Sequence, residues 1–109
     1  SVDYPDFAHA VCRAVEQGQA RFGVLICGTG IGMSIAANRH AGIRCGLCAN
    51  ATMARLSREH NDANVLAIGA RIVGDVLALD ILATFLATAY AGGRHDRRIA
   101  KLSPGQDQT

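Results

Sequence analysis

Three short apolar runs restrict the fold of this chain more than any other feature. They lie at Phe22 to Cys27, Ile43 to Cys48 and Val65 to Ile68. Runs of this length with almost no polar residue are typical of parallel strands that are buried on both faces. Because segments with helical patterns separate them, they predict two βαβ units. The expected fold class is therefore α/β, a three-layer doubly wound (Rossmann-like) parallel sheet with helices on both faces.

Helical patterns fill the segments around these runs. The first follows Pro5, repeats apolar residues every four positions and stops at Gly18. Further helices are predicted at residues 31–39, 51–60, 75–90 and 94–102. The helix at 75–90 is expected to pack through a broad apolar face of Leu79, Leu82, Phe85 and Leu86. Residues 1–102 then form a single domain, and residues 103–109, which carry Pro, Gly and polar side chains, form a flexible C-terminal tail.

The charge balance argues against several classes of partner. Charged residues make up 18% of the 109 positions and the formal net charge is +2, so we expect neither nucleic acid nor a membrane surface as a partner. The longest apolar stretch, Val76 to Ala91, contains Asp80 and is shorter than the ~18 residues that a membrane helix needs. Cysteines in apolar segments favour reduced thiols in a cytoplasmic protein; they are Cys12, Cys27, Cys45 and Cys48.

A glycine-rich loop at residues 27–32 joins the first apolar run to the next helix. Ligands of such sheets bind at the carboxyl ends of the strands, and backbone N–H groups at a helix N-terminus favour an anion. The loop therefore predicts an anion pocket, with a tight turn without a ligand as the alternative. A dinucleotide fingerprint fails because Met33 replaces the third glycine and no acidic residue follows about 20 positions on. A P-loop fails because no Gly-Lys-Ser/Thr follows.

Cys27 lies where the first strand meets this loop. A thiol beside a helix N-terminus is placed where the thiolate is favoured, so Cys27 can take a proton; a buried structural cysteine is the alternative. Cys45 and Cys48 have the spacing of a redox or zinc pair. Residues three apart on a strand point to opposite faces, however, and cannot chelate one ion. His9 and Cys12 share a helix face without further ligands, and no metal site is predicted.

The same rule about strand ends also draws attention to the helix end from Ser57 to Asn61, which we expect at the ligand-binding edge of the sheet. His60 can act as an acid or base near neutral pH, and Asn61 can donate a hydrogen bond to an oxyanion. An exposed helix end capped by Asn61 explains the same residues equally well.

Arginines supply the remaining candidates. Arg71 follows the third apolar run, where its side chain can reach a ligand. Arg94 and Arg98 lie four residues apart on the last helix, so that one helix face can grip a phosphate group. A solvated basic helix is the alternative interpretation of this segment.

Four segments resemble, in chain order, the ribose-5-phosphate isomerase B and galactose-6-phosphate isomerase family. They are DYP (3–5), ICGTGIGMSIAAN (26–38), SREHNDANVLAIGAR (57–71) and GGRHDRR (92–98). The resemblance implies that Cys27 is the base, that His60 opens the sugar ring and that Asn61 contacts the enediolate. It assigns proton movement between the two oxygens to Thr29. It implies oxyanion and hydroxyl contacts from Gly28, Thr29, Gly30, Ile31 and Gly32, and phosphate contacts from Arg71, Arg94 and Arg98.

The same resemblance implies a reaction and an assembly. The reaction is the interconversion of ribose 5-phosphate and ribulose 5-phosphate through a cis-enediolate, without a metal or organic cofactor. The assembly is a homodimer or a dimer of dimers with the active site between subunits. The neighbouring subunit contributes the C-terminal arginines to each site. Isomerisation of allose 6-phosphate, galactose 6-phosphate or a tetrulose phosphate remains open. So do a non-catalytic sugar-phosphate-binding subunit and a nucleotide-binding domain.

Members of that family begin with a further strand-helix-strand segment that carries a substrate-contacting Asp-His pair. The resemblance here starts after that segment. We therefore expect this chain to be an N-terminally incomplete fragment of a longer enzyme. The missing first strand would leave the run from Phe22 to Cys27 as an unprotected edge of the sheet.

Overall fold

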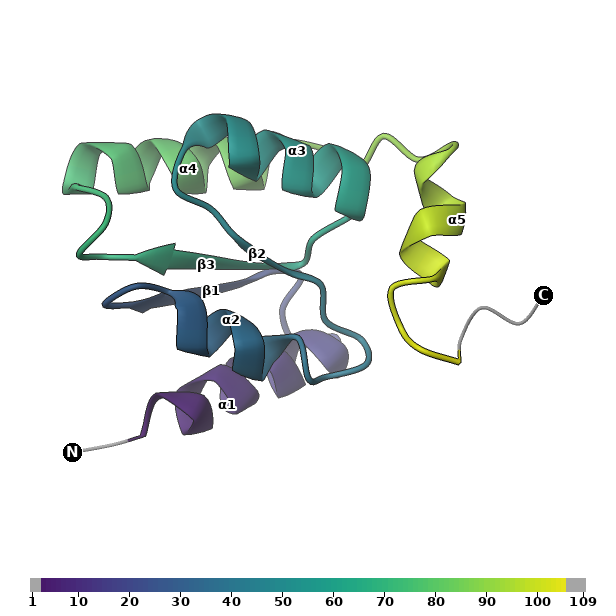
Figure 1. Cartoon of the computed structure of the whole chain (residues 1–109), viewed down its shortest axis with the longest axis horizontal. Coiled ribbons are helices and arrows are strands. Elements are labelled where there is room, and N and C mark those ends of the chain that lie inside the picture. Colours follow the sequence, from purple (N-terminus) through teal and green to yellow (C-terminus); the bar gives the residue numbers. More distant parts are fainter. Residues whose placement is uncertain (1–2, 106–109) are drawn as a thin grey trace.

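The computed structural model describes residues 3–105 and places a three-stranded parallel sheet between two layers of helices (Figure 1). Residues 1–2 of the predicted domain and residues 106–109 of the predicted tail lie outside the described residues. In chain order the elements are α1 (Tyr4–Glu16), β1 (Gly23–Cys27), α2 (Ile31–Ala37), β2 (Cys45–Leu47), α3 (Ala51–Asn61), β3 (Val65–Gly69), α4 (Asp75–Ala87) and α5 (His95–Ala100).

The strand order is β1-β3-β2, so the last strand of the chain lies in the middle of the sheet. Both pairings are parallel, and they set Cys27 opposite Gly69 and Leu47 opposite Ala67. All three strands therefore point the same way, and their carboxyl ends form one edge of the molecule, toward which the β3 arrow points in Figure 1.

Alternate residues of β3 separate the two halves of the core. Val65 and Ala67 pack in a cluster with residues of α1 and α2, whereas Leu66 and Ile68 pack in a second cluster with residues of α3 and α4. All five residues of β3 are buried. A nearly continuous apolar strand has this burial pattern when helices cover both faces of the sheet. The predicted three-layer α/β fold class is confirmed.

Two element ends differ from the sequence prediction because side chains complete the backbone hydrogen bonding there. At the outer edge of β2, the amide of Asn38 bonds to both backbone groups of Cys45, at 2.8 and 3.1 Å. This amide takes the place of a further strand, and the regular strand has three residues. α4 stops at Ala87 rather than at Tyr90, because Thr88 is extended and its carbonyl accepts a hydrogen bond from Arg58.

Apolar side chains are spread over most of the circumference of α4, so its sequence pattern could not select the packed face. Ile81 and Phe85 are buried against β3, but Leu79 and Leu86 are 67% and 52% exposed. The prediction that Leu79 and Leu86 belong to the packed face is wrong for the described chain. None of the helices formed by residues 3–105 is long and apolar enough to cross a membrane.

β1 pairs with β3 alone among the described residues, and its other edge is open. Ile26 on this strand is 57% exposed. The run from Phe22 to Cys27 thus forms an unprotected edge, as its sequence context led us to expect.

Candidate active site

Cys27 and the loop after it form a first cluster at the carboxyl ends of the strands. Gly30 has φ of 79°, and a Cβ atom there would lie 2.6 Å from Leu47 Cδ1 and 3.1 Å from the backbone nitrogen of Gly69. Only glycine fits this position, because both the left-handed backbone and the close packing exclude a side chain. The loop is consequently pressed onto the ends of β2 and β3.

The thiol of Cys27 is held by this loop. Its sulfur accepts a hydrogen bond from the backbone N–H of Gly30 at 3.2 Å, and the residue is half-buried. A donor aimed at sulfur binds an ionised thiolate more strongly than a neutral thiol. The arrangement fixes the sulfur at the rim of the sheet while leaving part of the side chain accessible.

The loop offers fewer free donors than its sequence predicts. The N–H of Gly30 is engaged by Cys27, and the N–H of Ile31 donates to Thr29 Oγ1 at 3.2 Å. Thr29 itself is exposed, so its hydroxyl can still donate a hydrogen bond to a ligand. An oxyanion bound here would therefore contact loop N–H groups other than those of Gly30 and Ile31.

Arg71 belongs to the same cluster. Its backbone N–H donates to the carbonyl of Gly28 at 2.9 Å, and the N–H of Ala70 donates to the carbonyl of Cys27 at 2.7 Å. A Cβ atom on Gly28 would lie 3.5 Å from Nε of Arg71, so the guanidinium lies beside the loop. The guanidinium is a cation at the same end of the sheet as Cys27, and Arg71 remains a candidate phosphate ligand.

An apolar cavity of about 230 Å³ adjoins this cluster. Its walls come from the loop, from the ends of β2 and β3 and from the segment before α4; they are Thr29, Ile31, Leu47, Cys48, Ala49, Gly69, Ile72 and Val73. Around it, Ile31, Ile72 and Val76 are each more than half exposed. The carboxyl end of the sheet therefore combines the thiol with an apolar surface.

His60 and Asn61 lie at the other end of the sheet. They close α3, and the chain then enters β3 at Val65. β3 spans five residues, and at about 3.3 Å per residue its two ends are separated by roughly 13 Å. The expectation that the helix end from Ser57 to Asn61 shares the edge of Cys27 is wrong, because a helix that follows one strand must return the chain to the amino end of the next.

Asn61 is also not the cap of α3. That position belongs to Asp62, which adopts the left-handed conformation with φ of 46°. Its carboxylate accepts from the buried Arg58 at 2.9 Å and lies 3.7 Å from Arg44. Asn61 is left exposed with its side chain free to face a ligand.

Arg94 and Arg98 join this second cluster through α5. The imidazole rings of His60 and His95 stack with centroids 4.4 Å apart and planes inclined by 20°. The N–H of Ala91 donates to the carbonyl of Glu59 at 3.1 Å. In Figure 1, α5 accordingly lies against the end of α3, away from the loop that holds Cys27.

Tyr90 and Asp96 fasten the start of α5. The tyrosine hydroxyl donates to Asp96 Oδ1 at 2.5 Å. Desolvation and this hydrogen bond to a carboxylate raise the pKa of Tyr90 to about 12. Desolvation, reinforced by His60, Arg94 and Arg98, lowers the pKa of His95, with Asp96 acting in the opposite direction. His95 is therefore neutral near pH 7.

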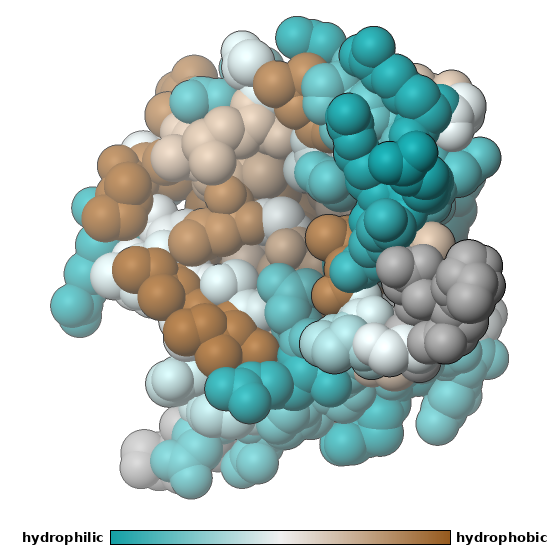
Figure 2. Space-filling view, turned by 45° about the vertical axis from the view of Figure 1, so that its right-hand side comes forward, coloured by the Kyte–Doolittle hydropathy of each residue, from teal (hydrophilic) through white to brown (hydrophobic). Residues whose placement is uncertain are grey.

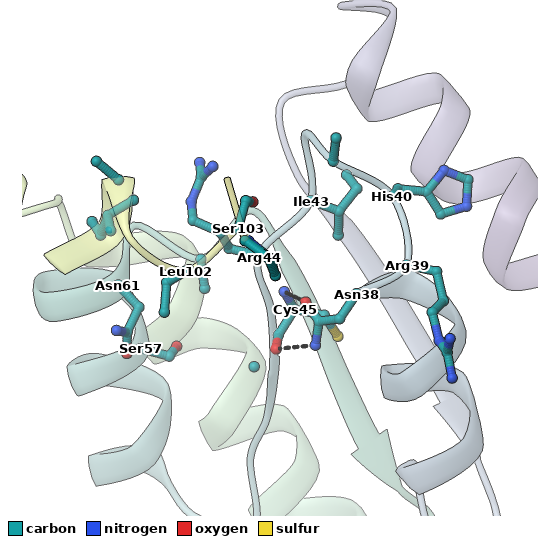
Figure 3. A pocket seen from close by; sticks show the side chains of 16 residues that line it. Asn38, Arg39, His40, Ile43, Arg44, Cys45, Ser57, Asn61, Leu102 and Ser103 are labelled. Atoms are coloured by element: carbon teal, nitrogen blue, oxygen red, sulfur yellow. Dashed lines mark hydrogen bonds between the residues drawn. The ribbon is translucent and has the colours of Figure 1, made fainter. Parts of the chain in front are cut away.

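A larger cavity of about 760 Å³ opens beside the second cluster. Figure 3 shows Ser57 and Asn61 on one side of it and Asn38, Arg39 and His40 on the other, with Leu102 and Ser103 close by. Its lining mixes polar and apolar side chains, whereas the cavity near Cys27 is lined almost entirely by apolar ones. Figure 2 shows the same division at the surface, where hydrophilic side chains gather over the end that carries α5 and hydrophobic ones lie toward the opposite end.

Cys45 and Cys48 lie on separate faces of the sheet. Cys45 packs against the core cluster on the α1 side of the sheet, and Cys48 belongs to the cluster on the α4 side. Burial raises the pKa of Cys45 to about 12, and the pKa of Cys48 is also raised by burial. Among residues 3–105, no group of three or more His, Cys, Asp or Glu side chains is arranged to hold a metal ion.

Sequence reasoning missed two residues that shape the second cluster. Arg58 was not singled out, although it is 2% exposed and donates three hydrogen bonds. His95 was seen only as part of a basic segment, although it is the buried residue of α5. No local pattern identifies the long-range contacts, because Thr88 lies 30 positions from Arg58 and His60 lies 35 positions from His95.

Known proteins match this chain over most of its length. Residues 1–102 match the ribose/galactose isomerase family. Ribose-5-phosphate isomerase B of Escherichia coli is 50% identical over 101 residues, which are 93% of this chain and 68% of that protein. A solved ribose-5-phosphate isomerase B from Clostridium thermocellum superposes with a TM-score of 0.92 and 57% identity, covering 94% of this chain and 69% of that one.

A second solved structure, of the Thermotoga maritima enzyme, is 55% identical with a TM-score of 0.91 and covers 93% of this chain and 70% of that one. The α/β fold is thus that of an isomerase enzyme. The chain belongs to the ribose/galactose isomerase family.

Proposed function

We propose that this sugar-phosphate isomerase interconverts ribose 5-phosphate and ribulose 5-phosphate, with Cys27 as the base. The observation that carries the proposal is the Cys27 sulfur, held by the Gly30 N–H at the carboxyl edge of the sheet beside an exposed Thr29 hydroxyl. The named activity of the Escherichia coli and Clostridium thermocellum relatives supports this choice of substrate.

The chemistry needs only a proton carrier and stabilisation of negative charge. The Cys27 thiolate removes the proton from C2 of the open-chain aldose, and the electron pair moves into a cis-enediolate. Loop N–H groups and Asn61 would stabilise the developing oxyanion. Thr29 passes a proton between O1 and O2, and Cys27 returns its proton to C1. Substrate and product are isomers, so the reaction is balanced without a cofactor or a metal.

Two copies of the chain would complete the site. Cys27 and Arg71 lie at one end of the sheet, whereas His60, Asn61, Arg94 and Arg98 lie at the other. We propose a homodimer, or a dimer of dimers, in which the second cluster of one subunit faces the first cluster of its partner. Phosphate would then bind to Arg71 of one subunit and to Arg94 and Arg98 of the other. The exposed Ile31, Ile72 and Val76 around the first cluster support a protein contact there.

An isomerase assay on the full chain tests the reaction, with ribose 5-phosphate supplied and ribulose 5-phosphate measured. Cys27→Ala should abolish turnover while phosphate-ligand binding is retained. Cys12→Ala is the matched control, because Cys12 is a fully buried thiol of α1 with no assigned role in the site. Equal activity of Cys27→Ala and the unsubstituted chain would refute the assignment of the base.

Mixing two inactive variants tests the shared site. Cys27→Ala and His60→Ala damage different clusters, so a mixed dimer contains one site with both defects and one site with neither. After subunit exchange at equal concentrations, about a quarter of the full activity should return. Activity that stays at the level of the separate variants would show that each subunit works alone.

The family that matches this chain spans ribose and galactose isomerases, which makes a hexose phosphate the second candidate substrate. The two are distinguished by kcat/KM for ribose 5-phosphate and galactose 6-phosphate under the same conditions. We also propose a cytoplasmic location, since Cys12, Cys27, Cys45 and Cys48 are free thiols.

A further inference from the structure

His95 anchors α5 in an unusual way. α5 has six residues. Arg94 just before it and Arg98 within it are exposed, whereas His95 is 8% exposed. An aliphatic or aromatic side chain at this position would bury more apolar area than an imidazole does. The position is instead filled by a ring that lies on the ring of His60, 35 positions earlier in the chain.

The stacked pair connects two proposed tasks. His60 closes α3, and under the proposed function it opens the sugar ring. His95 begins α5, directly after Arg94 and three residues before Arg98. A shift of the His95 ring would therefore move both proposed phosphate ligands relative to His60. Two hydrogen bonds near this junction, from Ala91 to Glu59 and from Tyr90 to Asp96, involve the segment just before α5 or its first turn.

The charges around His95 suit a neutral ring. The groups that act on it are His60 from α3 and Arg94, Arg98 and Asp96 from α5. Two protonated imidazoles at 4.4 Å would repel each other. With His95 neutral, no cation is stacked on the His60 ring.

We propose that His95 is a positioning residue, whose ring fixes the plane of the His60 imidazole and, through α5, the place of Arg94 and Arg98. This inference rests on the proposed function for its kinetic consequence, but the stacking itself is independent of it. The substitution His95→Phe keeps a flat ring at this position, and His95→Ala removes it. Arg97→Gln is the matched control, because Arg97 is exposed on the same helix and has no assigned role.

The first measurement is the NMR spectrum of the His60 imidazole in the full chain, with its signals assigned through His60→Gln. The signals should move on His95→Ala, because the ring-current shift from the stacked ring is lost, and should stay shifted in His95→Phe. If His95→Ala leaves the His60 signals where they are, the two rings do not stack in solution and the proposal is overturned. This result does not depend on any enzymatic activity.

The second measurement is steady-state isomerisation in both directions. His95→Ala should lower kcat/KM for ribose 5-phosphate by about 10- to 100-fold, the loss expected when a reacting group is displaced by about 1 Å. kcat with ribulose 5-phosphate should fall less, since this ketose has its C5 oxygen phosphorylated and forms no furanose ring. The KM should rise in both directions, because Arg94 and Arg98 move.

His95→Phe should recover most of the loss, and Arg97→Gln should match the unsubstituted chain. A His95→Phe variant as impaired as His95→Ala would overturn positioning by the ring, and would indicate that an imidazole nitrogen takes part in the chemistry. An unsubstituted chain that isomerises no sugar phosphate would instead refute the proposed function, and the His60 signals would still decide whether the stack exists.

Discussion

Arg58 is predicted to hold the second cluster together, and replacing it with methionine tests this. Its guanidinium donates to the carbonyls of Ala63 and Thr88 at 2.7 and 3.0 Å and to Asp62 at 2.9 Å. It also lies 4.9 Å from the centroid of Phe22. Methionine keeps most of the aliphatic volume and contacts the ring, so the substitution isolates the hydrogen bonds of the charged head.

The magnitude follows from how far each partner is buried. Hydrogen bonds from a charged donor to the two carbonyls contribute about 1.5 to 3 kcal/mol each, and both carbonyls lose their donor. Asp62 has a side chain that is 39% exposed, so its ion pair adds at most about 1 kcal/mol. Packing by the methionine side chain offsets a part of this loss in stability. We expect a loss of about 3 to 5 kcal/mol in the free energy of unfolding.

Urea unfolding followed by far-ultraviolet circular dichroism measures this loss at a fixed chain concentration. The midpoint should fall by about 2 to 3 M. Arg55→Met is the matched control: Arg55 lies on the same helix and pairs with Glu59 at 2.9 Å, but the pair is exposed and should be worth at most about 0.5 kcal/mol. A loss below about 1 kcal/mol for Arg58→Met would refute the reasoning, because the two carbonyls would then be satisfied without the guanidinium.

Three further predictions concern the loop, the phosphate and the pH. Gly30→Ala should lower the free energy of unfolding by about 2 kcal/mol or more and should also lower turnover. Gly18→Ala is the control: Gly18 also has a positive φ, but an added Cβ would meet no atom within 4 Å, so only the backbone cost of about 1 kcal/mol is expected. Equal losses of the two variants in urea unfolding would contradict the packing at Gly30. Arg98→Ala should raise the KM for ribose 5-phosphate about 10- to 100-fold with an unchanged unfolding midpoint, and an unchanged KM would remove Arg98 from phosphate binding. Because the pKa of His95 is held below its ordinary 6.5, the folded chain binds fewer protons than the unfolded one, so this contribution to stability is complete above about pH 6.5 and is lost as the pH falls below it. Between pH 7.5 and pH 5.5 the unfolding midpoint should therefore fall further for the unsubstituted chain than for His95→Phe. An equal fall in both would contradict the lowered pKa of His95.

The sheet and its two covered faces could be predicted from the sequence because a buried parallel strand leaves a local signal. Val65 to Ile68 is apolar at every position, which is the pattern of a strand covered by helices on both faces of the sheet. Cys27 and the loop could be placed for the same reason, since the strand end and the glycines are contiguous in the chain.

The ends of the helices depended on distant partners and were predicted less well. α4 stops before Tyr90 because the carbonyl of Thr88 is taken by Arg58, 30 positions earlier. The stack of His60 on His95 joins residues 35 positions apart. Neither contact has a periodicity or a local motif, so both become visible only in three dimensions.

The division of the candidate site into two clusters is a consequence of topology. Cys27 lies after a strand and Asn61 lies before one, and in a parallel sheet these two places are at opposite edges. No side-chain movement within one chain closes a gap of roughly 13 Å that β3 itself spans. A twofold axis can set the carboxyl edge of one copy against the amino edge of another, and such a dimer contains two equivalent contacts of this kind. Under the proposed function, Arg58 and His95 would then act on catalysis in the neighbouring subunit, so their effects should appear in mixed dimers at the site that contains the partner's Cys27.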